Sequence, residues 1–202
     1  MEINMILTTS YLPPISWFAP IAKGEPICIE QWENFHKQTI RNRCTIDSPN
    51  GALNLTIPVD KENFGAGGKC LMKDVMISYH LDWQHQHWSA LETTYFNSPF
   101  FEYLQDDFRP FYERKWKYLM DFNEALILKC CELMDIDAKI NRTEEFLINT
   151  EKGSPVQHSE AHFPDYYQVF AHKHGFVPNL SIIDLIFNMG PESVLYLEKV
   201  KQ

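Results

Sequence analysis

The stretch that decides the fold is residues 3–30, INMILTTSYLPPISWFAPIAKGEPICIE. Its first apolar run, residues 3–8, ends at Thr8-Thr9-Ser10 and leads into the turn Tyr11-Leu12-Pro13-Pro14. The apolar stretch 15–22 then predicts a short helix, and Pro26-Ile27-Cys28-Ile29-Glu30 predicts a second strand. Because a crossover helix joins strands that run in the same direction, the stretch predicts a parallel α/β opening.

A β-hairpin is predicted next, from 43–47 and 52–59, because Asn50-Gly51 between β-branched residues is a strong turn signal. Residues 60–70 carry Gly65, Gly67 and Gly68 and predict a mobile loop. Only part of a phosphate-binding loop is present there, because Asn63 and Cys70 occupy positions that need glycine and Ser/Thr.

The middle of the chain is predicted to be helical. Trp83, His87, Leu91 and Tyr95 recur every four residues and lie on one helical face, and Ser98-Pro99 ends that helix. Two more helices are expected at 100–118 and 122–134, and polar residues 149–165 predict a loop. Near the end, Ser181 and Asp184 resemble a capping box, and Gly190-Pro191 separates two final helices.

These elements predict an α/β fold, with a mixed sheet from the N-terminal third packed by helices of the C-terminal two-thirds. An α+β arrangement is the alternative. The chain has 202 residues and no internal repeat, and we expect a single domain over residues 1–202.

Composition excludes some classes of function. The net charge of −9 repels phosphate backbones and disfavours nucleic acid, although a local Arg/Lys cluster can still hold a small anion. No run of apolar residues is long enough for a membrane span. Five cysteines lack the spacing of a zinc site and are read as reduced thiols, and with no signal-peptide pattern this predicts a cytoplasmic protein.

Four sets of polar residues are candidates for a site. Lys37, Arg41, Asn42 and Arg43 form a basic cluster that suits phosphate and sugar hydroxyls, although it is equally typical of a solvated turn. His87 is a candidate general base, although a hydrogen-bonded core histidine is the more common case.

The other two groups favour structure. The pair His158 and His162 has metal-ligand spacing, but the prolines at 155 and 164 favour a loop, so we assign no metal site. In the stretch from Asn179 to Glu192, capping explains Ser181 and is one role for Asp184, while Asn179 and Asn188 have no obligatory structural role and stay open to a ligand role.

In order and spacing these motifs resemble the WbqC-like protein family along nearly the whole chain. The motifs are Arg41-Asn42-Arg43, the Trp83–Tyr95 helix with Ser98-Pro99-Phe100-Phe101, and residues 179–184. One departure lies in the opening loop, where Thr9-Ser10 replaces the Gln-Pro usual in the family.

The resemblance implies a bacterial protein of O-antigen or other surface-polysaccharide biosynthesis. Our leading hypothesis is an enzyme or binding protein that acts on an activated sugar, such as a nucleotide sugar, or transfers a small group to it. The sequence does not identify a cofactor. The alternatives are a non-catalytic scaffold for glycan-biosynthesis enzymes and a nucleotide-binding transferase. The candidate catalytic residues are His87 and Asp184, and the candidate ligand-binding residues are Lys37, Asn42, Arg43, Tyr95, Asn179 and Ser181.

Overall fold

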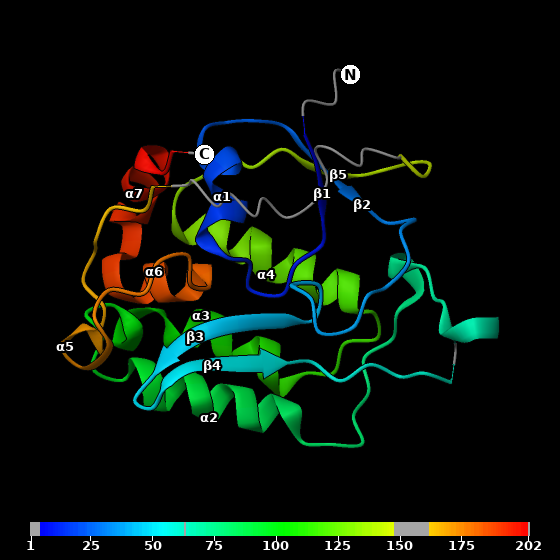
Figure 1. Ribbon diagram of the computed structural model, residues 1–202, viewed down its shortest axis with the longest axis horizontal. Helices are drawn as coiled ribbons and strands as arrows, with labels where there is room; N and C mark the ends of the chain where they lie inside the picture. The colour runs from blue at the N-terminus through cyan, green and yellow to red at the C-terminus, as the bar shows by residue number, and fades with distance from the viewer. Residues whose placement is uncertain (1–4, 63, 148–161, 202) are drawn as a thin grey trace.

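A computed structural model describes residues 5–62, 64–147 and 162–201 (Figure 1). It contains a small parallel sheet, a separate β-hairpin and a set of helices, which confirms the α/β class. The parallel sheet has the strand order β1-β2-β5, with β1 at Met5–Thr8, β2 at Ile27–Glu30 and β5 at Ile140–Arg142.

The predicted opening is confirmed. Helix α1 spans Ile15–Ala22 between β1 and β2, and the two strands pair in parallel with Met5 opposite Ile27 and Thr8 opposite Glu30. Seven of its eight residues are buried, because α1 also packs against the last helix, α7 (Ser193–Lys199). An apolar sequence without a polar face therefore forms a short interior helix.

The predicted hairpin is also confirmed. Strand β3 spans Arg43–Ser48 and β4 spans Gly51–Thr56, paired antiparallel from Arg43 opposite Thr56 to Ser48 opposite Gly51. Gly51 has φ +98°, a conformation that favours glycine over other residues. These antiparallel strands form their own sheet beside the parallel one.

Three helices make up the middle of the chain: α2 at Trp83–Tyr95, α3 at Phe101–Glu113 and α4 at Leu119–Leu133. The first agrees with the predicted face, since Trp83, His87, Leu91 and Tyr95 are all buried. The second ends at Glu113, before the predicted 118, and α4 begins at Leu119, before the predicted 122. Two short 3₁₀ turns precede them, η1 (Ala66–Gly68) and η2 (Met72–Asp74).

The C-terminal part has two helices that the sequence predicted, α6 (Ile182–Met189) and α7, separated by η3 (Gly190–Glu192). A four-residue helix, α5 (Ala171–His174), was not predicted. Ser181 caps α6 as expected, accepting a hydrogen bond from the Ile183 amide. The capping-box role of Asp184 was wrong, because its carboxylate faces the core and accepts from Tyr95 and Tyr166 instead.

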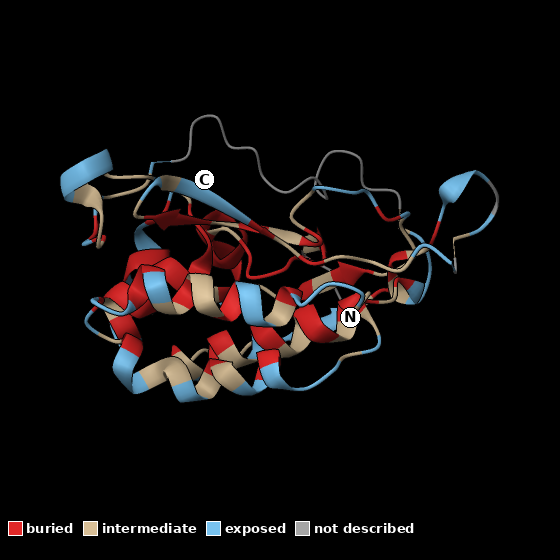
Figure 2. Ribbon diagram, turned by 90° about the horizontal axis from the view of Figure 1, so that it is seen from below, coloured by how far each residue is buried: buried red, intermediate tan, exposed pale blue. Residues whose placement is uncertain are grey.

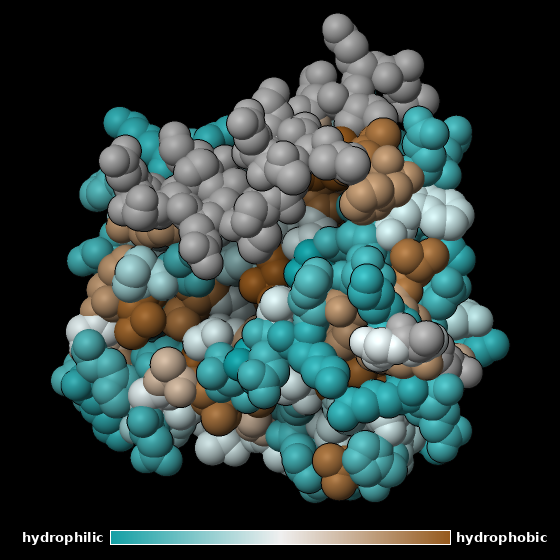
Figure 3. All heavy atoms as spheres, turned by 45° about the vertical axis from the view of Figure 1, so that its right-hand side comes forward, coloured by the Kyte–Doolittle hydropathy of each residue, from teal (hydrophilic) through white to brown (hydrophobic). Residues whose placement is uncertain are grey.

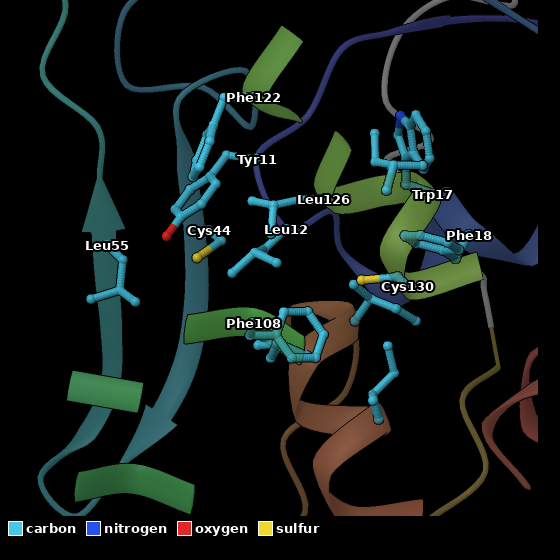
Figure 4. Packing of buried hydrophobic residues seen from close by; sticks show 14 of the residues in the cluster. Tyr11, Leu12, Trp17, Phe18, Cys44, Leu55, Phe108, Phe122, Leu126 and Cys130 are labelled. Carbon is cyan, nitrogen blue, oxygen red and sulfur yellow. The ribbon is translucent and has the colours of Figure 1, made fainter. Parts of the chain in front are cut away.

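The buried residues lie on the inner faces of the helices, and exposed residues lie on the outer faces (Figure 2). In the core, the Tyr11 ring lies beside Phe122 of α4 and Cys44 of β3 (Figure 4). Residues from the opening turn, the hairpin and the helices thus share one hydrophobic cluster. No helix among the described residues is long and apolar enough to cross a membrane.

Candidate functional site

The edge where the parallel strands end is rich in buried polar side chains. Strands β1, β2 and β5 run in the same direction, so Thr8, Glu30 and Thr143 lie at the same edge. All three side chains are buried, with Glu30 only 6% exposed. In open parallel sheets, ligands bind at this carboxyl edge.

An ion pair contacts this edge at the end of β1. The guanidinium of Arg41 donates from Nε and Nη2 to the two carboxylate oxygens of Glu33, and from Nη1 to the hydroxyl of Thr39 at 3.2 Å. Thr8 donates its hydroxyl to the same Glu33. Arg41 is 9% exposed, so the pair is largely removed from water, and a two-point contact fixes both side chains.

A second network holds the end of β2. Glu30 accepts hydrogen bonds from the Thr143 hydroxyl at 2.9 Å and from the Trp32 and Leu147 amides at 2.6 and 2.9 Å. Three donors satisfy this buried carboxylate. The segments that follow β2 and β5 are thereby fixed to each other.

Behind the edge, two buried amides have unused acceptor capacity. Asn123 of α4 donates to the Thr9 hydroxyl and the Arg41 carbonyl, and Asn42 donates to the Ile57 carbonyl. Within the described residues, neither amide oxygen accepts a hydrogen bond. Unsatisfied buried polar atoms are uncommon and often mark functional regions.

One segment beside this edge, residues 36–73, is basic in an otherwise acidic chain, whereas Glu30 and Glu33 at the edge and Glu144 and Glu145 after β5 are acidic. Residues 36–73 carry six of the 18 Lys and Arg residues but only three of the 27 acidic residues. Backbone hydrogen bonds place residues 70–73 beside 31–35, including Phe35 to Cys70 and Lys73 to Gln31. The loop that partly resembles a phosphate-binding loop therefore leads directly to the polar edge. In Figure 3, in which the right-hand side of Figure 1 comes forward, hydrophilic side chains surround smaller hydrophobic areas.

The members of the predicted basic cluster lie in different environments. Lys37 is exposed in the segment after β2. Arg43 is half-buried at the start of β3 and donates from Nε to the Thr56 hydroxyl at 3.0 Å. Asn42 turns inward to Ile57, and Arg41, which was not among the chosen ligand-binding residues, forms the ion pair.

The predicted base His87 lies inside the core, 5% exposed. Burial lowers its pKa to about 4, opposed by a hydrogen bond to the Thr56 backbone that raises the pKa. A bond that raises the pKa of an imidazole is one donated to an acceptor, here the Thr56 carbonyl. The other ring nitrogen, Nδ1, then accepts from the Tyr11 hydroxyl at 3.0 Å, and Tyr11 bonds to Tyr112 at 2.9 Å.

Two other predicted residues, Tyr95 and Asp184, contact each other. Tyr95 donates to Asp184 Oδ1 at 2.9 Å, while Tyr166 and Gln168 donate to Oδ2. The pKa of Asp184 is raised to about 6, chiefly by burial; the hydrogen bonds from Tyr166 and Tyr95 oppose this rise, and the nearby carboxylate of Asp47 adds to it. A carboxyl group with this pKa can give or take a proton near neutral pH.

Asp47 is an unusual neighbour for Asp184. Its side chain is 3% exposed, and neither carboxylate oxygen accepts a hydrogen bond from the described residues. The imidazole of His174 approaches it, with Nε2 4.0 Å from Asp47 Oδ1. Burial raises the pKa of Asp47, and His174 lowers it.

The last predicted residues, Asn179 and Ser181, bind the opening turn. Asn179 Oδ1 accepts from the Ser16 amide at 2.9 Å, and the Ser181 hydroxyl donates to the Leu12 carbonyl at 2.8 Å. Asn179 thus supplies an acceptor to a backbone amide in the first turn of α1. Its φ of +54° is one that asparagine tolerates.

The structure brings together Tyr95 with Asp184, and Arg43 with His87 through Thr56, but leaves Lys37 apart from His87. Sequence reasoning missed Thr8, Glu33 and Asn123 as members of the polar edge. The position of Thr8 at the end of a strand was a usable signal, whereas Asn123 lies on a helix and gave none.

Of the paired histidines, His158 lies outside the described residues. Among the described residues, no group of three or more His, Cys, Asp or Glu side chains is placed to hold a metal ion.

Comparisons with known proteins agree with the motifs. The model of the WbqC-like protein family matches residues 9–159 and 149–196. A similar protein is the uncharacterised protein Rv1507c of Mycobacterium tuberculosis, which is 24% identical over 239 residues, covering all of both chains. No solved structure matches the chain.

Proposed function

Because the chain belongs to the WbqC-like protein family, we propose that it acts in bacterial surface-polysaccharide biosynthesis on an activated sugar, bound at the carboxyl edge of the parallel sheet. The observation that carries this proposal is the Glu33–Arg41 ion pair at that edge, in which Arg41 is buried and Glu33 is partly buried. A buried ion pair is weak evidence for stability, because desolvation offsets its attraction. Its presence at the edge where such folds bind ligands supports a role in shaping a site.

The basic segment 36–73 beside the edge supports an anionic ligand. Lys37 and Arg43 are the side chains proposed to hold phosphate, and Lys69 and Lys73 belong to the neighbouring segment. Arg41 is already paired with Glu33 and serves to position the loop between β2 and β3. A nucleotide sugar combines phosphates with hydroxyl groups, so it suits a basic surface beside threonine, serine and asparagine side chains.

For proton transfer, His87 and Asp184 are the proposed groups. At neutral pH His87 is uncharged, because its pKa is lowered to about 4, and it connects through Thr56 to Arg43. Asp184 has a pKa nearer the operating range, at about 6. Both are buried, so either role requires that the substrate or a water molecule reaches the interior. The cytoplasmic location also stays a prediction.

Direct binding tests the proposal. Purified protein is titrated with UDP-N-acetylglucosamine, GDP-mannose and ATP by isothermal calorimetry, and complexes are confirmed by native mass spectrometry. We expect a sugar nucleotide to bind, and the double variant Lys37→Ala/Arg43→Ala to bind at least tenfold more weakly. Lys139→Ala is the matched control, because Lys139 is exposed just before β5, at the opposite edge of the same sheet.

The outcomes separate the candidate functions. If ATP binds and the sugar nucleotides do not, the nucleotide-binding transferase replaces the activated-sugar hypothesis. If no nucleotide binds, or if Lys139→Ala weakens binding as much as the double variant, the proposed site is wrong.

A scaffold function is the second candidate, favoured by two exposed aromatic side chains. Phe96, just after α2, and Tyr103 of α3 are each 74% exposed. Exposed aromatic residues are enriched where proteins bind each other. Co-purification of a biosynthetic enzyme with the wild type, and its loss in Phe96→Ala/Tyr103→Ala, would support this function.

A further inference from the structure

An aromatic pocket lies on the opposite part of the fold from the basic segments, between the α6–α7 region and residues 164–167. Its volume is about 420 Å³. The residues that line it are Phe100, Pro164, Asp165, Tyr166, Tyr167, Asn188, Met189, Glu192, Leu195, Tyr196 and Lys199. Four of these are aromatic and two are acidic.

Two buried aromatic rings form one corner of the pocket, and a more exposed ring lies beside them. Tyr166 and Tyr196 are both buried, with ring centroids 5.0 Å apart and ring planes at 74°. Tyr167, by contrast, is 58% exposed, and among the described residues neither Tyr167 nor Phe100 stacks on another ring. The Tyr196 hydroxyl donates to the Pro164 carbonyl at 2.7 Å, which fixes the corner to the segment that carries Tyr167.

Negative charge collects around this corner. Asp165 and Glu192 are exposed at the pocket, and the buried Asp184 lies behind Tyr166, which donates to its carboxylate. Burial, followed by Asp165 and Asp184, raises the pKa of Tyr196. The carboxylates of Asp165 and Asp184 therefore both lie near Tyr196.

The pocket also has an unused acceptor and little positive charge. Asn188 is 4% exposed, and within the described part of the chain its Oδ1 accepts no hydrogen bond. Its amide nitrogen donates to the Asp184 carbonyl at 2.8 Å, which fixes its orientation. Lys199 is the cationic lining residue, and among the described residues it makes no ion pair with Asp165 or Glu192.

From these observations we propose that the pocket binds an organic cation, an alkylammonium group held against the aromatic rings with the carboxylates at its rim. Aromatic faces attract cations, and aromatic cages recognise quaternary ammonium groups. An apolar pocket with a few converging polar groups is also the usual form of a small-molecule site. The residues that line the pocket are not among those proposed for the activated-sugar site, although Asp184, which lies behind Tyr166, is also a proposed proton-transfer group there.

The test compares a cation with its uncharged counterpart. Choline chloride and ethylammonium chloride are titrated into the full-length protein and followed by the chemical shifts of the pocket residues. Sodium chloride is the ionic-strength control, and 3,3-dimethyl-1-butanol is the neutral counterpart of choline. We expect at least one ammonium compound to bind at low millimolar concentration, and the neutral alcohol to bind at least tenfold more weakly.

Two variants locate the site. Tyr167→Ala removes an exposed ring, and Asp165→Asn removes one rim charge with little change in shape. Both should weaken ammonium binding at least fivefold, whereas Tyr103→Ala, an exposed tyrosine outside the pocket, should not. If Tyr167→Ala does not fold, Asp165→Asn decides the question.

Three results would overturn the proposal. The first is equal affinity for the neutral alcohol. The second is no binding of either ammonium compound at 50 mM, set as roughly the upper limit of a weak specific site. The third is binding that neither pocket variant weakens. Choline binding without ethylammonium binding identifies a quaternary ammonium ligand, and the reverse identifies a primary amine. In either case the organic-cation site stands.

Discussion

The hydroxyl of Tyr95, on α2, donates a 2.9 Å hydrogen bond to the buried carboxylate of Asp184, on α6, across 89 residues of sequence. The bond joins a middle helix to a C-terminal helix inside the core. It also favours the charged form of Asp184, opposing the burial that raises its pKa.

Removing that donor should destabilise the protein. Tyr95→Phe leaves one carboxylate oxygen of Asp184 without its donor and should lower the free energy of unfolding at pH 7 by about 1–3 kcal/mol. Urea unfolding measures the change, and Tyr103→Phe is the control because its ring is 74% exposed. An equal effect of the two variants would contradict the importance of this bond.

The titration of Asp184 should appear as a pH-dependent stability. Its folded pKa of about 6 is above the ordinary 3.8, so the folded state holds the proton more tightly. Stability from this group is present below pH 3.8 and is lost as pH rises through 6. The free energy of unfolding of Asp184→Asn relative to wild type should therefore be higher at pH 7 than at pH 4.5, by on the order of 2–3 kcal/mol.

Urea unfolding at both pH values checks this expectation. Asp106→Asn is the control, since Asp106 is exposed on α3. The loss of a hydrogen-bond acceptor in Asp184→Asn applies at both pH values and cancels in the comparison. A pH-independent difference between Asp184→Asn and wild type would show that Asp184 does not titrate in this range.

His87 should have the opposite pH dependence. Its folded pKa of about 4 is below the ordinary 6.5, so the unfolded chain binds the proton more readily. Stability from neutral His87 is present above pH 6.5 and is lost as pH falls through 4. His87→Gln should therefore lose less stability than wild type between pH 7 and pH 4.5, by on the order of 2–3 kcal/mol.

The exposed His85 lies on the same helix, so His85→Gln is the matched control, measured by the same unfolding experiment. If both variants respond to acid alike, burial of His87 is not the cause. In the wild type the two buried groups act against each other, so their combined effect on stability between pH 4 and 6.5 should be small.

Gly190 should not tolerate a side chain. It has φ +58°, and a Cβ there would lie 2.5 Å from the Phe100 ring. Gly190→Ala should lower the melting temperature, with the overlap alone amounting to about 1–3 kcal/mol. Gly24→Ala is the control for backbone strain, because Gly24 has φ +76° with nothing within 4 Å of its Cβ. Equal effects would mean that the Phe100 ring moves away freely.

Local sequence signals predicted the strand-helix-strand opening, the Asn50-Gly51 hairpin and helix α2. They did not predict β5, because three residues with no alternating pattern form a strand only by pairing with β2. Helix α5 is four residues long and is therefore also too short to show a helical periodicity in the sequence.

The site was less predictable than the fold. Arg41 was visible in a basic cluster, but its partner Glu33 could be identified only once the loop after β2 was folded. Asn123, on α4, reaches the polar edge by donating to the carbonyl of Arg41, which lies 82 residues earlier in the sequence. Hydrogen bonds between distant segments follow from tertiary packing, and a single sequence carries no periodic trace of them.

The pairing of Ile27 with Ile140 has a consequence for synthesis on the ribosome. The nascent chain holds β1, α1 and β2 long before the strand that completes their sheet has emerged. Helix α1 also waits for α7, since Lys23 donates to the Val200 carbonyl. Distant pairings of this kind slow folding and leave apolar segments exposed in the meantime. We therefore expect the first hundred residues to need chaperone protection until the rest of the chain is made.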